Sequence, residues 1–315
     1  MRDVSALQLR PLRFHLTAAQ PIYFPPGKAS NILRGGFGRC FRSIACTPDC
    51  TAPPACPFPG QCPYAAIFEP KLEDGPSGLA DAPRPFLFRA PHLDGRRIQP
   101  NEPFHFDLHL FDLRPHITAY FISAFQQFAE TGIGPARGAA RLSSISILDA
   151  VRQPVSEIFR DGTLHANVPF PPVEISLIPQ AHPVTTVAIH FQTPTELRKG
   201  QPNTEPPPFS IVLARLRDRI SNLLILYGDG QPDFDFAGLT QRAQSVIIER
   251  AALTHQETHR YSGRHAGPHP IGGFLGTIQY TGNLTEFLPI LKAGEWTGVG
   301  RHTVWGNGQF EVWTR

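Results

Sequence analysis

The sequence contains little lysine and no long apolar run. Its 29 basic residues include only four lysines, namely Lys28, Lys71, Lys199 and Lys292. No stretch approaches the roughly 18 apolar residues of a membrane-spanning helix. The N-terminus also lacks the basic segment followed by an apolar segment that marks a secretory signal. We therefore expect a soluble, cytoplasmic protein that has no membrane partner.

Charge is distributed unevenly along the 315 residues, whose net charge is +3. Residues 1–45 hold seven basic side chains and a single aspartate, so the remaining residues are slightly acidic as a group. Arginine pairs with phosphate through two parallel hydrogen bonds and stacks on bases, which lysine does poorly. The preference for arginine is therefore compatible with a nucleic-acid partner, and equally with the codon bias of a GC-rich genome.

Four glycines flank two basic residues close to the C-terminus. The glycine-rich loop, residues 296–308, reads W-T-G-V-G-R-H-T-V-W-G-N-G and contains Gly298, Gly300, Arg301, His302, Gly306 and Gly308. Before it, Asn283 and Glu286 have the spacing of a capping box, which predicts a helix over 284–293 that ends at Gly294. A strand over 309–313 follows.

The glycine-rich loop differs from a nucleotide-binding P-loop. A P-loop follows a strand, precedes a helix and contains Gly-Lys-Ser/Thr. This loop follows a predicted helix, precedes a strand and lacks that sequence. We expect it to present free backbone N–H groups beside Arg301 and His302, an arrangement that suits the phosphates of a polymer.

Apolar periodicity predicts two similar halves. In the first half, strands are expected over 7–16, 86–89, 104–111 and 142–150, with helices over 30–45 and 117–130. In the second half, strands are expected over 184–191, 258–261, 274–280 and 309–313, with helices over 209–226, 236–251 and 284–293. Each half follows the order of a ferredoxin-like fold. The prediction is an α+β protein with tandem ferredoxin-like, RRM-like domains at 1–152 and 183–315, joined by a Pro-rich linker at 153–182.

A cysteine-rich loop, residues 46–66, is inserted in the first domain. Cys46, Cys50, Cys56 and Cys62 are spaced C-x3-C-x5-C-x5-C among prolines that exclude a helix. A cytosolic chain rarely keeps disulfides, so we favour a structural zinc bound by the four thiolates. The usual C-x2-C pairs are missing, and an iron–sulfur cluster or free or disulfide-bonded thiols remain alternatives.

Five further motifs accompany the glycine-rich loop in a fixed order. They are Leu33–Arg42 (LRGGFGRCFR), Cys62–Glu69 (CPYAAIFE), Thr131–Gly138 (TGIGPARG), Thr193–Arg198 (TPTELR) and Arg260–Arg264 (RYSGR). Together the sequence resembles the CRISPR precursor-RNA-processing endoribonucleases of the RAMP superfamily. The resemblance implies binding of CRISPR repeat RNA and cleavage without a metal ion or other cofactor. The ribose 2′-OH attacks the adjacent phosphate, and the product hairpin stays bound.

This reaction needs a base, an acid and cations around the phosphorane. Many members of the family carry a histidine on or near the first helix, but Arg39 stands where one is expected. The candidate catalytic residues are therefore Arg34, Arg39, Tyr261, Arg264 and His265. The candidate RNA-binding residues are Lys28, Arg42, Arg260, Gly298, Gly300, Arg301, His302, Gly306 and Gly308.

The first helix also contains Gly35, Gly36 and Gly38. Glycine lowers the stability of a helix by roughly 1 kcal/mol relative to alanine. Close approach of RNA and close packing against the protein explain these glycines equally well.

Two other functions remain open. One is a non-catalytic RNA-binding subunit that joins other subunits of a CRISPR effector complex, which the missing first-helix histidine favours. The other is an unrelated zinc-containing interaction protein, against which the order of the motifs argues.

Overall fold

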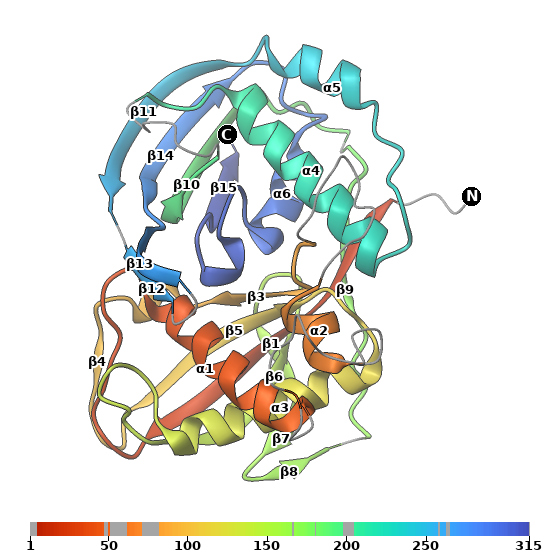
Figure 1. The fold of residues 1–315 in the computed structure, drawn as a ribbon. Helices are drawn as coiled ribbons and strands as arrows, with labels where there is room; N and C mark the ends of the chain where they lie inside the picture. The colour runs from red at the N-terminus through yellow and green to blue at the C-terminus, as the bar shows by residue number, and fades with distance from the viewer. Residues whose placement is uncertain are drawn as a thin grey trace. The chain divides into compact units, whose positions relative to one another are not determined.

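The order strand–helix–strand–strand–helix–strand occurs twice along the chain (Figure 1). The computed structural model describes residues 5–46, 50, 62–70, 82–165, 167–179, 181–197, 205–257, 259–262 and 265–314. The chain divides into an N-terminal unit, residues 9–173, and a C-terminal unit, residues 1–8 with 174–315. No helix among the described residues is long and apolar enough to span a membrane.

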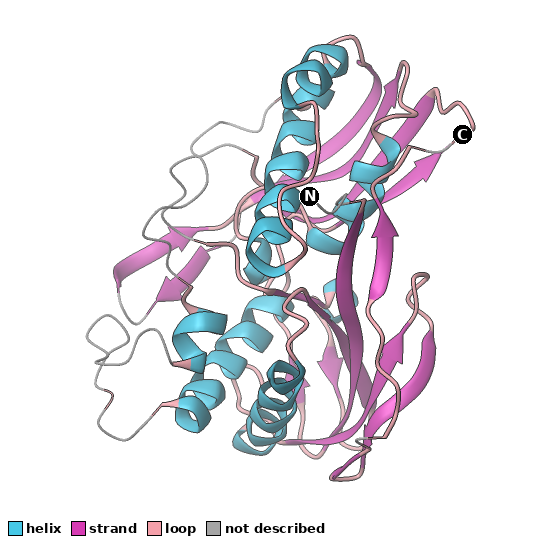
Figure 2. Ribbon diagram, turned by 90° about the vertical axis from the view of Figure 1, so that its right-hand side faces the viewer, coloured by secondary structure: helices cyan, strands magenta, loops and turns pink. Residues whose placement is uncertain are grey.

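The first half of the chain forms an antiparallel sheet with helices packed on it (Figure 2). Its elements are β1 (Ala6–Ala18), β2 (Ile22–Tyr23), α1 (Ala29–Ala45), α2 (Pro63–Phe68), β3 (Phe86–Arg89), η3 (Pro91–Leu93), β4 (Arg97–Ile98), β5 (Pro103–Leu110), α3 (Pro115–Thr131), β6 (Ala140–Leu148), β7 (Pro154–Arg160), β8 (Thr163–Leu164) and β9 (Val173–Ser176). The sheet has the order β3-β5-β1-β6-β7-β8, with β9 also paired to β1. Strands β3, β5, β1 and β6 therefore follow the ferredoxin-like order.

Phenylalanine fills the core between this sheet and its helices. Phe37 of α1 stacks on Phe121 of α3 with ring centroids 4.2 Å apart, and Phe14 of β1 stacks on Phe106 of β5 at 5.1 Å. All four side chains are fully buried. A Cβ atom at Gly36 would lie 2.0 Å from the ring of Phe128 on α3. The aromatic core therefore requires a glycine at this point of α1.

The second half of the chain forms a similar sheet of four strands and a separate two-stranded hairpin. Its elements are β10 (Thr186–Thr195), α4 (Phe209–Tyr227), α5 (Phe236–Ala243), β11 (Ile247–Gln256), β12 (His259–Ser262), β13 (His265–Pro270), β14 (Gly273–Thr281), α6 (Leu288–Thr297), η4 (Thr303–Trp305) and β15 (Phe310–Thr314). The strand order β11-β14-β10-β15 is again ferredoxin-like. The prediction of an α+β protein with two tandem ferredoxin-like folds is confirmed.

Two elements of the second half differ from the prediction. The helix expected over 236–251 ends at Ala243, and β11 begins at Ile247. The β-branched run Val246, Ile247 and Ile248 favours a strand, and β14 supplies the backbone partners. The strand expected over 258–261 belongs instead to the separate hairpin β12–β13.

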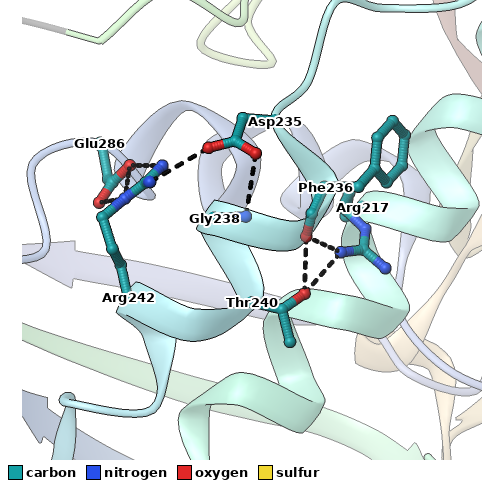
Figure 3. A network of polar contacts seen from close by, with 7 residues as sticks. All are labelled: Arg217, Asp235, Phe236, Gly238, Thr240, Arg242 and Glu286. Atoms are coloured by element: carbon teal, nitrogen blue, oxygen red, sulfur yellow. Dashed lines mark hydrogen bonds and ion pairs between the residues drawn. The ribbon is translucent and has the colours of Figure 1, made fainter.

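The capping box predicted before the last helix is wrong. Helix α6 begins at Leu288, and its N-cap residue, Phe287, makes no side-chain cap. Glu286 instead forms an ion pair with Arg242 at 2.8 Å, as Figure 3 shows. Gly294 does not end the helix, because α6 continues to Thr297. A Cβ at Gly294 would lie 2.6 Å from Leu216 and Phe310, so this glycine permits close helix packing.

Three histidines lie close together, His15 on β1 and His105 on β5 of the N-terminal sheet and His92 on η3. Because Phe14 points into the core, His15 points to the opposite face, where it lies across from His105 with the rings 6.1 Å apart. His92 stacks on His105 at 4.5 Å. Burial lowers the pKa of all three, and that of His105 falls to about 4 because His92 and Arg13 also lie nearby.

We expect the melting temperature to fall as the pH is lowered from about 6.5 to 4. A histidine in the unfolded chain titrates near 6.5, whereas His105 stays neutral in the folded protein down to about pH 4. The unfolded state therefore binds more protons in this interval and is favoured. Calorimetry across this pH range should show that the melting temperature of His105→Asn falls less than that of the wild type.

The matched control for this pH effect is His116→Asn, which changes an exposed histidine at the start of α3. It should leave the slope of melting temperature against pH unchanged. If the melting temperature depends on pH with the same slope in His105→Asn and the wild type, His105 is not the cause of the fall.

Candidate nucleic-acid interface

Close backbone approaches shape the glycine-rich loop between α6 and β15. Gly300 has φ +79°, and a Cβ there would lie 2.4 Å from the carbonyl oxygen of Glu196. Gly308 has φ +72°, and a Cβ there would lie 1.9 Å from the carbonyl oxygen of Val299. Both positions combine a left-handed backbone with a contact that excludes any side chain. Packing within the C-terminal unit therefore accounts for these two glycines.

Much of the loop backbone is hydrogen-bonded within the protein. The N–H of Val299 donates to Gly308 O at 2.9 Å, that of Arg301 to Glu196 O at 2.8 Å, and that of Gly308 to Pro194 O at 3.0 Å. The expectation of a loop with free N–H groups is wrong for these donors, because the first bond closes the loop on itself and the other two join it to residues at the end of β10. What the loop presents is chiefly side chains.

Glu196 holds both basic side chains of the loop. Its carboxylate accepts a hydrogen bond from Arg301 Nη1 at 2.8 Å, and its other oxygen lies 3.5 Å from His302 Nε2. The ring of His302 stacks on Trp305 at 4.5 Å. Because the Arg301 side chain is 39% exposed, the ion pair stabilises the loop by only about 0.2–1 kcal/mol. A phosphate can therefore compete for Arg301.

A half-buried arginine of α4 contacts the beginning of the glycine-rich loop. Arg219, on α4, donates from Nε to Thr297 O at 2.6 Å, at the C-terminal end of α6. A cation at this end of a helix interacts favourably with the helix dipole. Burial lowers the pKa of Arg219 to about 10, which leaves the side chain charged at neutral pH.

The candidate residues of α1 differ in exposure. Arg34 is 8% exposed, and its guanidinium lies over the ring of Phe68 at 4.5 Å. Arg39 is exposed to solvent. Arg42 donates from Nη2 to Cys50 O at 3.3 Å. Arg34 is therefore largely shielded from solvent, whereas Arg39 is exposed. The catalytic roles predicted for both stay predictions.

A carboxylate far away in the sequence caps the start of α1. The carboxylate of Asp94, which follows η3, accepts a hydrogen bond from Ala29 N at 2.8 Å. Burial raises the pKa of Asp94, and the backbone N–H groups of Ala29 and Lys28 partly offset this. The Asp94 carboxylate thus already accepts hydrogen bonds from the backbone N–H groups at the start of α1, where Lys28 lies.

One glycine of α1 faces open space. A Cβ at Gly38 would lie 2.2 Å from Phe68, so packing explains this glycine as it does Gly36. At Gly35, by contrast, no described atom beyond its own helix and chain neighbours lies within 4 Å of the Cβ position. Gly35 precedes Arg39 by one helical turn, so both lie on the same side of α1. Close approach of RNA remains an explanation for Gly35 alone.

The other candidate catalytic residues lie on or beside the hairpin β12–β13. Arg260 and Tyr261 are on β12, and His265 begins β13 opposite Ser262. Arg264 lies outside the described residues. The α1 candidates belong to the N-terminal unit and the hairpin to the C-terminal unit, so their meeting at one phosphate stays a prediction.

Three cysteines of the cysteine-rich loop fall within the described residues. Cys46 follows α1, and Cys62 precedes α2. The pKa of the Cys46 thiol is raised to about 11, mainly by burial and also by the neighbouring thiols of Cys50 and Cys62. Cys56 lies outside the described residues. Within the described part of the chain, no three potential ligands form a group that could hold a metal ion.

Glu196, Arg219 and Asp94 were not among the predicted site residues. Glu196 lies in the Thr193–Arg198 motif, which was the only signal that could have pointed to it. Arg219 and Asp94 act on helix ends far from them in sequence, and no local pattern marks such contacts.

Two family models match the chain. Residues 7–170, more than half of the chain, match AF_1859_N, described as an N-terminal domain. Residues 189–310 match the family described as CRISPR-associated endoribonuclease Cas6. The second match contains most of β10, the hairpin β12–β13 and the glycine-rich loop.

Solved structures share the fold. A Cas6 product complex has 15% identity and a TM-score of 0.55, covering 98% of this chain and 100% of that one. Thermus thermophilus Cas6 has 15% identity and a TM-score of 0.51, with 98% and 99% covered. A partial Cas6-RT-Cas1--Cas2 complex has 11% identity and a TM-score of 0.59, covering 100% of this chain and 47% of that one. No curated protein matches the chain closely enough to support an argument.

The match over residues 7–170 covers more than half of the chain, so the chain belongs to the family described as AF_1859_N. Over residues 189–310 the chain is Cas6-like, because that part matches the CRISPR-associated endoribonuclease Cas6 family.

Proposed function

We propose that the chain binds CRISPR repeat RNA and cleaves precursor crRNA by attack of a ribose 2′-OH, without a metal ion, and then retains the product hairpin. The observation that carries this proposal is the match of residues 189–310 to the Cas6 endoribonuclease family. Arg301 and His302, exposed and partly exposed within that range, would meet the RNA backbone.

The proposed catalytic residues come from α1 and from the segment around the hairpin β12–β13. Arg39 would stabilise the charge that develops on the phosphorane. His265 would act as base or acid, because an imidazole titrates near neutral pH. Tyr261 and Arg264 would position the phosphate, and Lys28, Arg42 and Arg260 would bind flanking phosphates.

One assay tests this function. The purified protein is incubated in EDTA with its cognate repeat RNA, and a single cut is expected that leaves a 2′,3′-cyclic phosphate and a 5′-OH. The matched control is the same RNA with a 2′-deoxyribose at the cut, which should bind equally well and remain intact because the nucleophile is missing. Cleavage of the deoxy substrate would contradict the proposed chemistry.

A second function is favoured by one observation. Helix α1, residues 29–45, contains no histidine, and its Arg34 is buried. The chain would then be a non-catalytic crRNA-binding subunit that works with other CRISPR proteins. Tight binding of the repeat without any cut, with or without divalent metal, would identify this alternative.

We also propose a structural zinc in the cysteine-rich loop. The proposal rests on the sequence, in which Cys46, Cys50, Cys56 and Cys62 are spaced C-x3-C-x5-C-x5-C. Metal-bound thiolates organise a loop that has no apolar core of its own.

We expect about one zinc per chain by elemental analysis, because four thiolates satisfy one tetrahedral ion. Cys50→Ser and Cys62→Ser should lose zinc and melt at a lower temperature, whereas Cys40→Ala, on α1, should keep its zinc. Metal-free wild-type protein of full stability would contradict this, and a visible absorption band would indicate an iron–sulfur cluster instead.

A further inference from the structure

The open face of the C-terminal sheet carries an exposed tryptophan. Ile189, Ile278 and Val312 are buried on the face covered by α4 and α6, so the alternating residues of these strands point the other way. Trp313 on β15 is one of them and is 51% exposed. Burial of a large aromatic ring is strongly favourable, and its exposure on a sheet face indicates a binding surface.

The indole ring is held in place by the neighbouring strand. Trp313 pairs with Ala188 on β10, and its ring stacks on His190 with centroids 5.4 Å apart and planes 13° from parallel. His190 Nδ1 in turn lies 3.0 Å from Thr277 Oγ1 on β14. The residue paired directly with Trp313, Ala188, has only a methyl side chain. One ring is therefore fixed and partly open to solvent.

The same face of the sheet carries polar side chains on β14 and β11. The register places Arg250, Gln279, Ala188 and Trp313 in one row across the four strands. Gln279 Nε2 donates to Glu249 Oε2 at 2.7 Å. An interface for a protein partner would carry a largely apolar centre, whereas this face offers one aromatic platform among hydrogen-bonding groups. That combination is typical of surfaces on which an unpaired base stacks.

We propose that Trp313 and His190 form a stacking platform for an unpaired nucleotide that flanks the RNA hairpin. The proposal rests on the proposed RNA-binding function and adds a contact that lies outside the glycine-rich loop. Trp313 would contact the base, and His190 would position the indole. Since Glu249 and Glu311 lie on the same strands as Arg250 and Trp313, the platform would contribute stacking and little neutralisation of phosphate.

The test compares repeat RNA with and without its unpaired flanking nucleotides. Trp313→Ala should bind the flanked RNA about tenfold more weakly, as expected for the loss of one stacked base, and should bind the isolated hairpin like the wild type. Trp313→Phe keeps an aromatic ring and should bind the flanked RNA within about threefold of the wild type. The affinity of His190→Ala for the flanked RNA should lie between those of Trp313→Ala and Trp313→Phe.

Two controls make the test specific. Ile247→Ala truncates another exposed side chain on the same sheet face and should leave RNA affinity unchanged. Abasic flanking nucleotides keep the phosphates and remove the bases, so they should weaken binding to the wild type and have no further effect on Trp313→Ala.

The outcomes separate the platform from the proposed function. Normal affinity of Trp313→Ala for flanked RNA, with normal binding of the hairpin, would overturn the platform alone. Equal effects of Trp313→Ala and Ile247→Ala on capture of a second CRISPR subunit, with no effect on RNA, would overturn it in favour of a protein contact. A wild type that binds no repeat RNA would overturn both proposals.

Discussion

Replacing His265 with alanine is expected to slow cleavage of repeat RNA by about 10²–10⁴-fold, the usual contribution of general acid–base catalysis. His265 begins β13, directly after the Arg260–Arg264 motif. As a base or an acid it would act on a proton and not hold the RNA. Affinity for the repeat should therefore stay within about threefold of the wild type. Single-turnover cleavage and a binding titration on the same RNA measure the two effects.

Arg39→Ala is the matched variant for the competing mechanism. If arginine carries the reaction by stabilising charge, Arg39→Ala should give the large loss and His265→Ala little. The wild-type rate should then show no step between about pH 5.5 and 7.5, where histidine titrates. A clear step in that range, lost in His265→Ala, would support the histidine.

Gly300→Asp is expected to lower repeat-RNA affinity at least tenfold, which corresponds to about 1.4 kcal/mol. Two effects act together. The carboxylate would stand beside Arg301 and repel phosphate, and the new Cβ would collide with Glu196 O, 2.4 Å away, at a residue with φ +79°. A non-glycine residue forced into such a backbone costs about 1–3 kcal/mol, so the melting temperature should fall as well.

Gly300→Ala separates these two effects. Alanine brings the Cβ and the backbone strain without the charge. If the loop contacts phosphate, the aspartate variant should bind RNA clearly more weakly than the alanine variant at equal melting temperature. Equal affinities of the two variants would show that the loop acts through its shape and not through contact with RNA.

Much of the fold could be predicted because apolar residues recur with a regular period. Phe86–Arg89 is a strand as expected, and the helices expected over 30–45 and 117–130 agree with α1 and α3 within two residues. The prediction failed at β11, an edge strand that buries almost none of its residues. Strand β11 is largely exposed, so it shows no alternation of buried and exposed residues, and only its pairing with β14 defines it.

The candidate site residues were chosen from motifs in the sequence, namely the glycine-rich loop, the Leu33–Arg42 motif and the Arg260–Arg264 motif, and their functional roles stay predictions. The roles of single residues depended on contacts distant in sequence. Phe68 covers Arg34, and Glu196 engages Arg301 across 105 positions.

The sequence by itself determined the two ferredoxin-like folds and the family, because both follow from local periodicity and from motifs in a fixed order. Only the tertiary structure decided what the glycines and arginines do. It assigned Gly36 and Gly38 to aromatic packing, Gly300 and Gly308 to backbone approach, and Trp313 to an open sheet face. A glycine or an arginine has the same local signal whether it meets RNA or protein, and only its three-dimensional neighbours distinguish the two.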